Sequence, residues 1–247
     1  MGYYDNLRLL KDLITMSFQE LIEKEREQRR IYILDTAEKL FFAKSFSGVS
    51  MEEIAKEVGL NKATLYIYFE NKDHLLFAII LRKTKELIGR YEECVSQKIS
   101  GREKCRLLGE TFLDFYRENP DYYRTICGVG PEIFKDSDNP IVRRVFELQE
   151  QELGMLRDAI REGIADGSVR DDLDPLEVAV YLSVISMSMV CLHPGWRNVL
   201  AAGNISFDRF IADYPRFIAA AVDRRDVPGK SPGRIGKKLP ADRCKKT

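Results

Sequence analysis

The residues of this chain that could bind a partner through their side chains lie at positions 50–72, in the run SMEEIAKEVGLNKATLYIYFENK. If residues 62–68 form a helix, a step of about 100° per residue places Ala63, Thr64 and Ile67 on one side. That side combines small groups with one hydroxyl and one larger apolar side chain. A helix with such a face can approach base edges in the major groove of DNA.

Cationic and phenolic side chains border this face. Lys62 stands at the start of the expected helix, Tyr66 and Tyr68 lie on its edges, and Leu65 and Phe69 lie opposite, toward an expected core. Ammonium and phenol groups donate hydrogen bonds to phosphate oxygens. The pattern predicts a DNA-binding helix. An apolar helix of an ordinary core is the alternative, and it leaves the caps and the turn around this segment unexplained.

Local signals define the elements that hold this helix. Ser50 and Glu53 have the S-x-x-E spacing of a capping box, and apolar residues recur through 51–58 with helical period. Gly59 suits the left-handed position after a helix, and Asn61 suits the N-cap of the next one. Two helices joined by a short turn that contains glycine predict a helix-turn-helix.

This region resembles the DNA-binding domain of the TetR family of transcriptional regulators. The resemblance runs from near Arg29 to near Leu81. The segments that carry it are Ala37–Phe41 with Phe46, Val49–Ala55, Gly59–Phe69 and Asn71–Lys72. It implies an all-α protein with an N-terminal three-helix helix-turn-helix domain and a C-terminal helical domain for ligand binding and dimerisation.

The resemblance also implies which residues contact a double-stranded DNA operator. The contacts it assigns mostly to phosphates are Ser50, Lys62, Thr64, Tyr66, Tyr68 and Lys72. The contacts it assigns to base edges are Ala63, Thr64 and Ile67. Many members carry a polar or aromatic residue where this chain has Ile67. Isoleucine can touch a thymine methyl group but cannot form a hydrogen bond, so the operator sequence is not predicted.

The chain has 39 Lys and Arg against 39 Asp and Glu, so its total charge carries no nucleic-acid signature. The distribution is uneven. Residues 24–90 carry 13 basic and 10 acidic residues, residues 91–223 carry 15 and 23, and the last 24 residues carry 9 and 2. A mildly basic front and an acidic middle fit DNA binding at one end of the chain, although an excess of three charges is small.

Periodicity predicts ten or so helices and no strand. The four expected segments are a helical N-terminal extension at 1–28, the helix-turn-helix domain at 29–74, a helical effector-binding and dimerisation domain at 75–223, and a basic, disordered tail at 224–247. We expect the extension to precede a separate first domain helix, and His193–Trp196 to form a loop.

Two late segments have spare apolar surface. Residues 175–191 are apolar all round for about 15 residues, which is short for a bilayer that needs roughly 20. We therefore expect no membrane span. The segment at 206–222 has a flat apolar side, and the resemblance implies that both helices pair with their copies in a homodimer.

A repressor of this family is implied to release DNA when a small apolar or aromatic effector binds in the second domain. Aromatic residues with a few polar tips, and adaptable methionines, suit such a ligand. The candidate wall is Phe112, Phe115, Tyr116, Tyr122, Tyr123, Ile126, Met187, Met189 and Trp196. Plain core packing is the alternative for the same stripe, and it is the commoner use of such a pattern.

Other function classes find little support. We find no nucleophile with a paired base, no phosphate-binding glycine loop and no metal spacing around the two histidines, so we expect no enzyme, cofactor or metal. Five cysteines without C-x-x-C spacing, and no secretory signal, lead us to expect a cytoplasmic protein. A helical ligand-binding or scaffold protein that has lost specific DNA binding is the alternative function.

Overall fold

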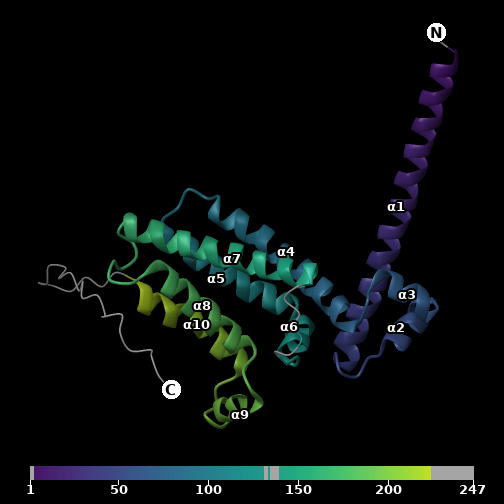
Figure 1. Ribbon diagram of the computed structural model, residues 1–247. Coiled ribbons are helices and arrows are strands. Elements are labelled where there is room, and N and C mark those ends of the chain that lie inside the picture. The colour runs from purple at the N-terminus through teal and green to yellow at the C-terminus, as the bar shows by residue number, and fades with distance from the viewer. Residues whose placement is uncertain (1–2, 131–132, 134–138, 224–247) are drawn as a thin grey trace, which may run out of the picture. The chain divides into compact units, whose positions relative to one another are not determined.

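The computed structural model describes residues 3–130, 133 and 139–223. This part of the chain is all-α, as predicted, apart from one isolated antiparallel bridge between Val169 and Asp223 (Figure 1). The helices are α1 (Tyr3–Lys44), α2 (Met51–Val58), α3 (Lys62–Tyr68), α4 (Lys72–Val95), α5 (Gly101–Glu118), α6 (Pro120–Cys127), α7 (Pro140–Ala165), α8 (Pro175–Val190), α9 (Pro194–Ala202) and α10 (Phe207–Val222). The predicted tail lies outside the described residues.

The chain divides into two compact units. The first comprises Met1–Ile88 and Tyr116–Gln149, and the second comprises Gly89–Phe115 and Glu150–Thr247. Helices α4, α5 and α7 contribute residues to both units. The segment boundaries expected from the sequence therefore stay predictions, because long helices run through the places where the chain changes unit.

Helix α1 is one continuous helix of 42 residues, and not an extension followed by a separate domain helix. The charged run at 23–30 consists of good helix formers without glycine or proline, so nothing in it ends the helix. Residues 18–29 are all exposed, whereas Ile33, Ala37 and Phe41 are buried. The same helix thus projects beyond α2 and α3 at one end and packs into the first unit at the other (Figure 1).

The first unit is built on the inward stripes of four short or amphipathic helices. Ile33 of α1, Ile54 of α2, Leu65 of α3, and Leu75 and Ile79 of α4 are each fully buried. Burying a side chain of this size stabilises a fold by about 1.5–3 kcal/mol. The core contributed by these helices fixes α3, which alone has only seven residues and could not persist by itself in water.

In the second unit, α5 and α7 approach closely at two glycines. A Cβ atom on Gly101 would lie 1.9 Å from the backbone nitrogen of Gly163, so only hydrogen fits there. The Gly101 N–H donates to Asp166 Oδ2 at 2.8 Å, which caps the start of α5. A buried cluster that includes Ile160 of α7 and Ala179 of α8 continues the core of this unit.

The segment after α8 is helical, which corrects the predicted loop at His193–Trp196. His193 acts as the N-cap of α9, with Nδ1 accepting the Gly195 N–H at 3.1 Å, and Pro194 occupies the first helical position. Proline is favoured there because its missing N–H would have no helical partner. The same dipeptide that indicated a break therefore starts a helix.

The described residues contain no single helix long and apolar enough to cross a membrane. Only the pair α8 and α9 reaches the required length and composition, and the two helices meet at an angle of 78°.

Candidate DNA-binding interface

The caps and the turn of the helix-turn-helix form as the sequence predicts. Ser50 Oγ accepts the Glu53 N–H at 3.2 Å at the start of α2, and Asn61 Oδ1 accepts the Thr64 N–H at 2.8 Å at the start of α3. Gly59 has a φ of 75°, in the left-handed region where glycine has no steric penalty. Backbone N–H groups that would otherwise lack partners at these ends are satisfied locally.

Helix α3 turns one face inward and leaves the opposite face exposed. Leu65 is fully buried and Phe69 is 2% exposed, whereas Ile67 is 67% and Tyr66 41% exposed. Ala63 is also exposed. The exposed isoleucine makes this face partly apolar, and burial against a partner would remove that apolar area from water. The face is thus available to a partner, and its contacts with bases stay a prediction.

Lys62 is held by an acidic residue of the preceding helix. Its ammonium group donates to the Glu52 carboxylate and also lies 5.8 Å from the centroid of the Tyr66 ring. The hydrogen bond raises the pKa of Lys62 and lowers the pKa of Glu52. Both side chains are more than half exposed, and exposed ion pairs contribute little stability. A phosphate group could therefore replace Glu52 as the partner of Lys62 at small cost.

Thr64 and Tyr68 are half-buried at the edges of the face, and Ser50 is exposed at the start of α2. The Thr64 hydroxyl donates to Asn61 Oδ1 at 2.9 Å. While this hydrogen bond is present, the Thr64 hydroxyl oxygen can accept a further hydrogen bond but cannot donate one. Thr64 can then read a base amino group without change, whereas a bond to a phosphate would require the hydroxyl to leave the cap.

Lys72 has partners inside the protein that the sequence pattern does not reveal. Its Nζ donates to the carbonyl oxygens of Phe46 and Val49, both at 2.9 Å, and lies 4.4 Å from the centroid of the Phe46 ring. These contacts tie the start of α4 to the loop between α1 and α2. A structural role for Lys72 follows directly, and its predicted phosphate contact stays a prediction.

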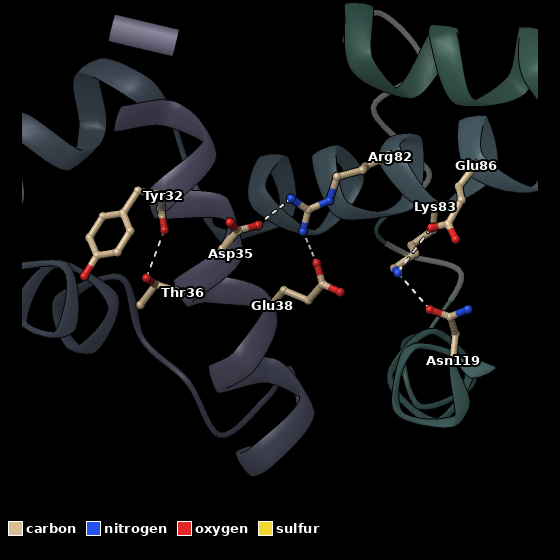
Figure 2. Close-up of polar contacts among 8 residues, drawn as sticks. All are labelled: Tyr32, Asp35, Thr36, Glu38, Arg82, Lys83, Glu86 and Asn119. Carbon is tan, nitrogen blue, oxygen red and sulfur yellow. Dashed lines mark hydrogen bonds and ion pairs between the residues drawn. The ribbon is translucent and has the colours of Figure 1, made fainter. Parts of the chain in front are cut away.

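An ionic cluster connects α4 to α1 (Figure 2). Arg82 points its guanidinium toward α1, where Nη1 lies 2.5 Å from Asp35 Oδ1 and Nη2 bonds to Glu38. The Glu38 side chain is only 14% exposed, and a partly buried carboxylate needs such a partner. This cluster could not be predicted from the sequence, because Arg82 lies more than 40 positions from both of its carboxylate partners and no local pattern links them.

The next residue of α4 reaches toward a different element. Lys83 Nζ donates to Asn119 Oδ1, just before α6, at 2.7 Å (Figure 2). From α6, Arg124 Nη2 donates to the Phe42 carbonyl in α1 at 3.0 Å. Helices α1, α4 and α6 are therefore joined pairwise by polar contacts within the first unit. Any displacement of α6 would act on both helices that support the helix-turn-helix.

The residues of the predicted effector wall fall in different environments. Those that are buried are Phe112, Phe115, Tyr122, Tyr123 and Met189, those that are half-buried are Tyr116 and Ile126, and those that are exposed are Met187 and Trp196. Tyr116 and Tyr123 meet edge to face with centroids 5.3 Å apart. Among the described residues, an open hollow of about 450 Å³ borders α7 and the start of α8, and none of the predicted wall residues lines it. The effector site stays a prediction.

Comparison with known proteins supports the DNA-binding character of the first unit. Residues 33–79 match the family model described as "Bacterial regulatory proteins, tetR family". The chain is similar to the Fatty acid metabolism regulator protein of Bacillus subtilis, with 23% identity over 151 residues, which are 61% of this chain and 76% of that protein.

Solved structures share the fold at low sequence identity. The structure of FadR from Bacillus subtilis in complex with stearoyl-CoA has a TM-score of 0.59 and 19% identity, and the match covers 76% of this chain and 96% of that one. The structure of AibR in complex with isovaleryl coenzyme A and operator DNA has a TM-score of 0.58 and 21% identity, with coverage of 78% and 97%. At this identity the likeness shows the fold alone.

Proposed function

Because this chain belongs to the TetR family of bacterial regulatory proteins, we propose that this DNA-binding transcriptional regulator is a repressor that acts as a homodimer. It leaves its operator when a small-molecule effector with an apolar part binds. The observation that carries the DNA-binding part is the exposed face of α3, where Ile67 is 67% exposed on a helix that is capped and anchored by Leu65. Loss of DNA binding, as in a pure scaffold, would remove the reason to keep that face.

The homodimer is supported by the surface of α8. Its outward side exposes a continuous apolar stripe made of Leu176, Val180, Tyr181, Val184, Ile185 and Met187. The opposite side is buried, and Ser186 bonds to Tyr214 of α10 at 2.9 Å, which holds the two helices together. On α10, Phe217 is 70% exposed. An exposed stripe of six large apolar side chains indicates an interaction site.

A two-fold dimer gives the DNA interface its geometry. An isologous pair presents two copies of α3, and regulators with helix-turn-helix motifs read half-sites about 34–36 Å apart or multiples of that distance. Each copy brings Lys62, Tyr66 and Tyr68 toward the phosphates beside its half-site. The expected operator is therefore an inverted repeat.

For the effector we propose an acyl-coenzyme A thioester. Two solved structures of the same fold are complexes with stearoyl-CoA and with isovaleryl coenzyme A. An acyl chain is the kind of apolar group that the aromatic and methionine residues of this chain could surround. An effector that binds better to the form with a different separation of the two α3 helices weakens DNA binding, and DNA weakens effector binding by the same factor.

The experiment that tests this proposal has two steps. The purified full chain is first incubated with the DNA upstream of its own gene in a mobility-shift assay at several salt concentrations. Binding should weaken with added salt, with a slope near −0.9 per phosphate contact. Acyl-coenzyme A esters of different chain length are then added, with free coenzyme A as control.

Three outcomes are informative. Release by acyl esters and not by free coenzyme A supports the whole proposal. DNA binding that no ester affects overturns the proposed effector and leaves the regulator. If an ester raises the melting temperature of the protein but the protein binds no DNA, the protein is the ligand-binding scaffold.

A further inference from the structure

Helix α9 carries two large apolar side chains that the described residues of its own unit leave exposed. Trp196 is 64% exposed and Val199 is 60% exposed. They are three positions apart, so they share one side of the helix. The structure describes all nine residues of α9, and none of them is buried. A tryptophan side chain has a large apolar area, so leaving it mostly exposed forgoes a large gain from burial.

The contacts that hold α9 involve Arg197 and the end of the helix. Arg197 Nε donates to the Leu192 carbonyl at 3.2 Å, and its guanidinium lies 3.8 Å from the centroid of the Phe207 ring. The Ile205 N–H donates to the Leu200 carbonyl at 2.9 Å. A helix of nine residues is marginal in water by itself. These contacts help to set its position and leave the face with Trp196 exposed.

Helix α9 follows α8 after three residues, and both helices expose apolar side chains. The apolar stripe on α8 reaches Met187 in its last turn, and α9 begins at Pro194. From Val178 to Trp196 the sequence contains no Asp, Glu, Lys or Arg. Exposed Glu177 and Arg197 flank this run with one charge of each sign, so the surface has no excess of positive charge for DNA phosphates or for an acidic peptide. A second copy of the same surface, which is mostly apolar and has no net charge, is complementary to it.

We propose that α9 is an arm of the dimer interface, and that Trp196 with Val199 anchors it on the second copy of the chain. The inference rests on the homodimer proposed above and extends it beyond α8 and α10. Buried tryptophans are among the residues that contribute most to interfaces, because one side chain removes a large apolar area from water at little entropic cost. Trp196, which the sequence suggested for an effector wall, thereby has a different role.

The chain offers its own probe, since Trp196 is its single tryptophan. We would dilute the full-length protein through its dimer dissociation, follow tryptophan emission and acrylamide quenching, and determine the oligomeric state in parallel by sedimentation velocity. The expected result is blue-shifted, protected emission in the dimer and red-shifted, readily quenched emission in the monomer. Tyr181→Arg, on the α8 stripe, should give the monomer values at every concentration.

Binding energy is tested by truncation. Trp196→Ala should raise the dissociation constant of the dimer at least about tenfold. The matched control is Phe18→Ala on α1, an aromatic residue of nearly equal exposure at 62% that lies outside this surface and should leave the constant unchanged. Val199→Asp keeps the fluorophore and should both weaken the dimer and expose Trp196.

The possible failures are separable. A stable dimer in which Trp196 is quenched as easily as in the monomer overturns the role of α9 and leaves the homodimer intact. A protein that is monomeric at all concentrations overturns both. Emission that shifts to the blue only when neutral phosphatidylcholine vesicles are added assigns the α8–α9 surface to lipid, and also overturns the inference.

Discussion

Two residues of α3 should act on DNA in different ways, because one carries a charge and the other does not. Lys62→Ala removes an exposed ammonium group and should weaken binding to all DNA sequences alike, with the slope of log K against log salt reduced by about one. Ile67→Ala removes an apolar contact and should leave that slope unchanged while altering preference at one base pair by about 1–3 kcal/mol. Titrations on an operator and its single-pair variants at three salt concentrations measure both.

These roles would be contradicted if each variant had the effect expected of the other. If Lys62→Ala changed base preference, or Ile67→Ala reduced the salt slope, α3 would lie in the groove in another orientation. Lys72→Ala is a useful third variant, because its Nζ already bonds to the carbonyls of Phe46 and Val49. An unchanged salt slope with a lowered melting temperature would assign Lys72 to folding alone.

Glu152 on α7 should make stability depend on pH. Burial raises the pKa of its carboxyl group from 4.5 to about 7. The folded protein then holds a proton that the unfolded chain has lost, so the free energy of unfolding falls as pH rises from about 4.5 to 7. The glutamine in Glu152→Gln cannot ionise. The free energy of unfolding of this variant should exceed that of wild type by about 1–3 kcal/mol at pH 8 and should equal it at pH 4.

Urea denaturation at both pH values measures this difference. Glu150→Gln, on the same helix but exposed, is the control and should show no dependence on pH beyond that of wild type. Equal gains for Glu152→Gln at pH 4 and pH 8 would mean that the carboxyl group has the same pKa in the folded and the unfolded protein, which would contradict the raised pKa.

At the scale of the element, helix ends were predictable wherever a cap is written in adjacent residues. Ser50 with Glu53 and Asn61 with Thr64 are such cases, and both caps form. Helix α9 was missed because Pro194 is compatible with a break and with a first helical position, and only His193 decides between them. The continuity of α1 was missed because nothing in its sequence marks an end.

Contacts between distant elements were not predictable. Arg82 of α4 meets Asp35 and Glu38 of α1 across 44 or more positions, and no periodic pattern encodes such a pairing. The candidate site likewise has one part that could be predicted from the sequence and one part that could not. The outward face of α3 follows from helical geometry, whereas the carbonyl partners of Lys72 follow only from the fold of the loop between α1 and α2.

The crossing of α5 and α7 gives an element-scale prediction with its own control. Gly101→Ala would place a Cβ atom 1.9 Å from the Gly163 nitrogen, so the two helices must separate, at a cost of about 1–3 kcal/mol or more. Gly109→Ala lies in the same helix, with nothing within 4 Å of its Cβ, and should stabilise by up to about 1 kcal/mol. Melting temperatures that move in the same direction in both variants would contradict the close crossing.

At the scale of the whole molecule, the proposed homodimer links dimerisation to DNA binding, because it would present two copies of α3 to one duplex. A dimer contacts about twice as many phosphates as a monomer and fixes the distance between half-sites. The exposed stripe of α8, with Tyr181 at 63% exposure, is where a single charge should prevent pairing. Tyr181→Arg therefore separates the contribution of one helix-turn-helix from that of two.

We expect Tyr181→Arg to bind the intact operator with roughly half the salt slope of wild type, since about half the phosphate contacts remain. Five base pairs inserted between the half-sites rotate one of them by about half a turn. Wild type should then lose most of its affinity, because a rigid dimer can reach only one half-site, whereas the monomeric variant should bind both operators equally. Equal loss in the two proteins would show that the half-sites are read by something other than a paired α3, and the linkage between dimer and operator would have to be abandoned.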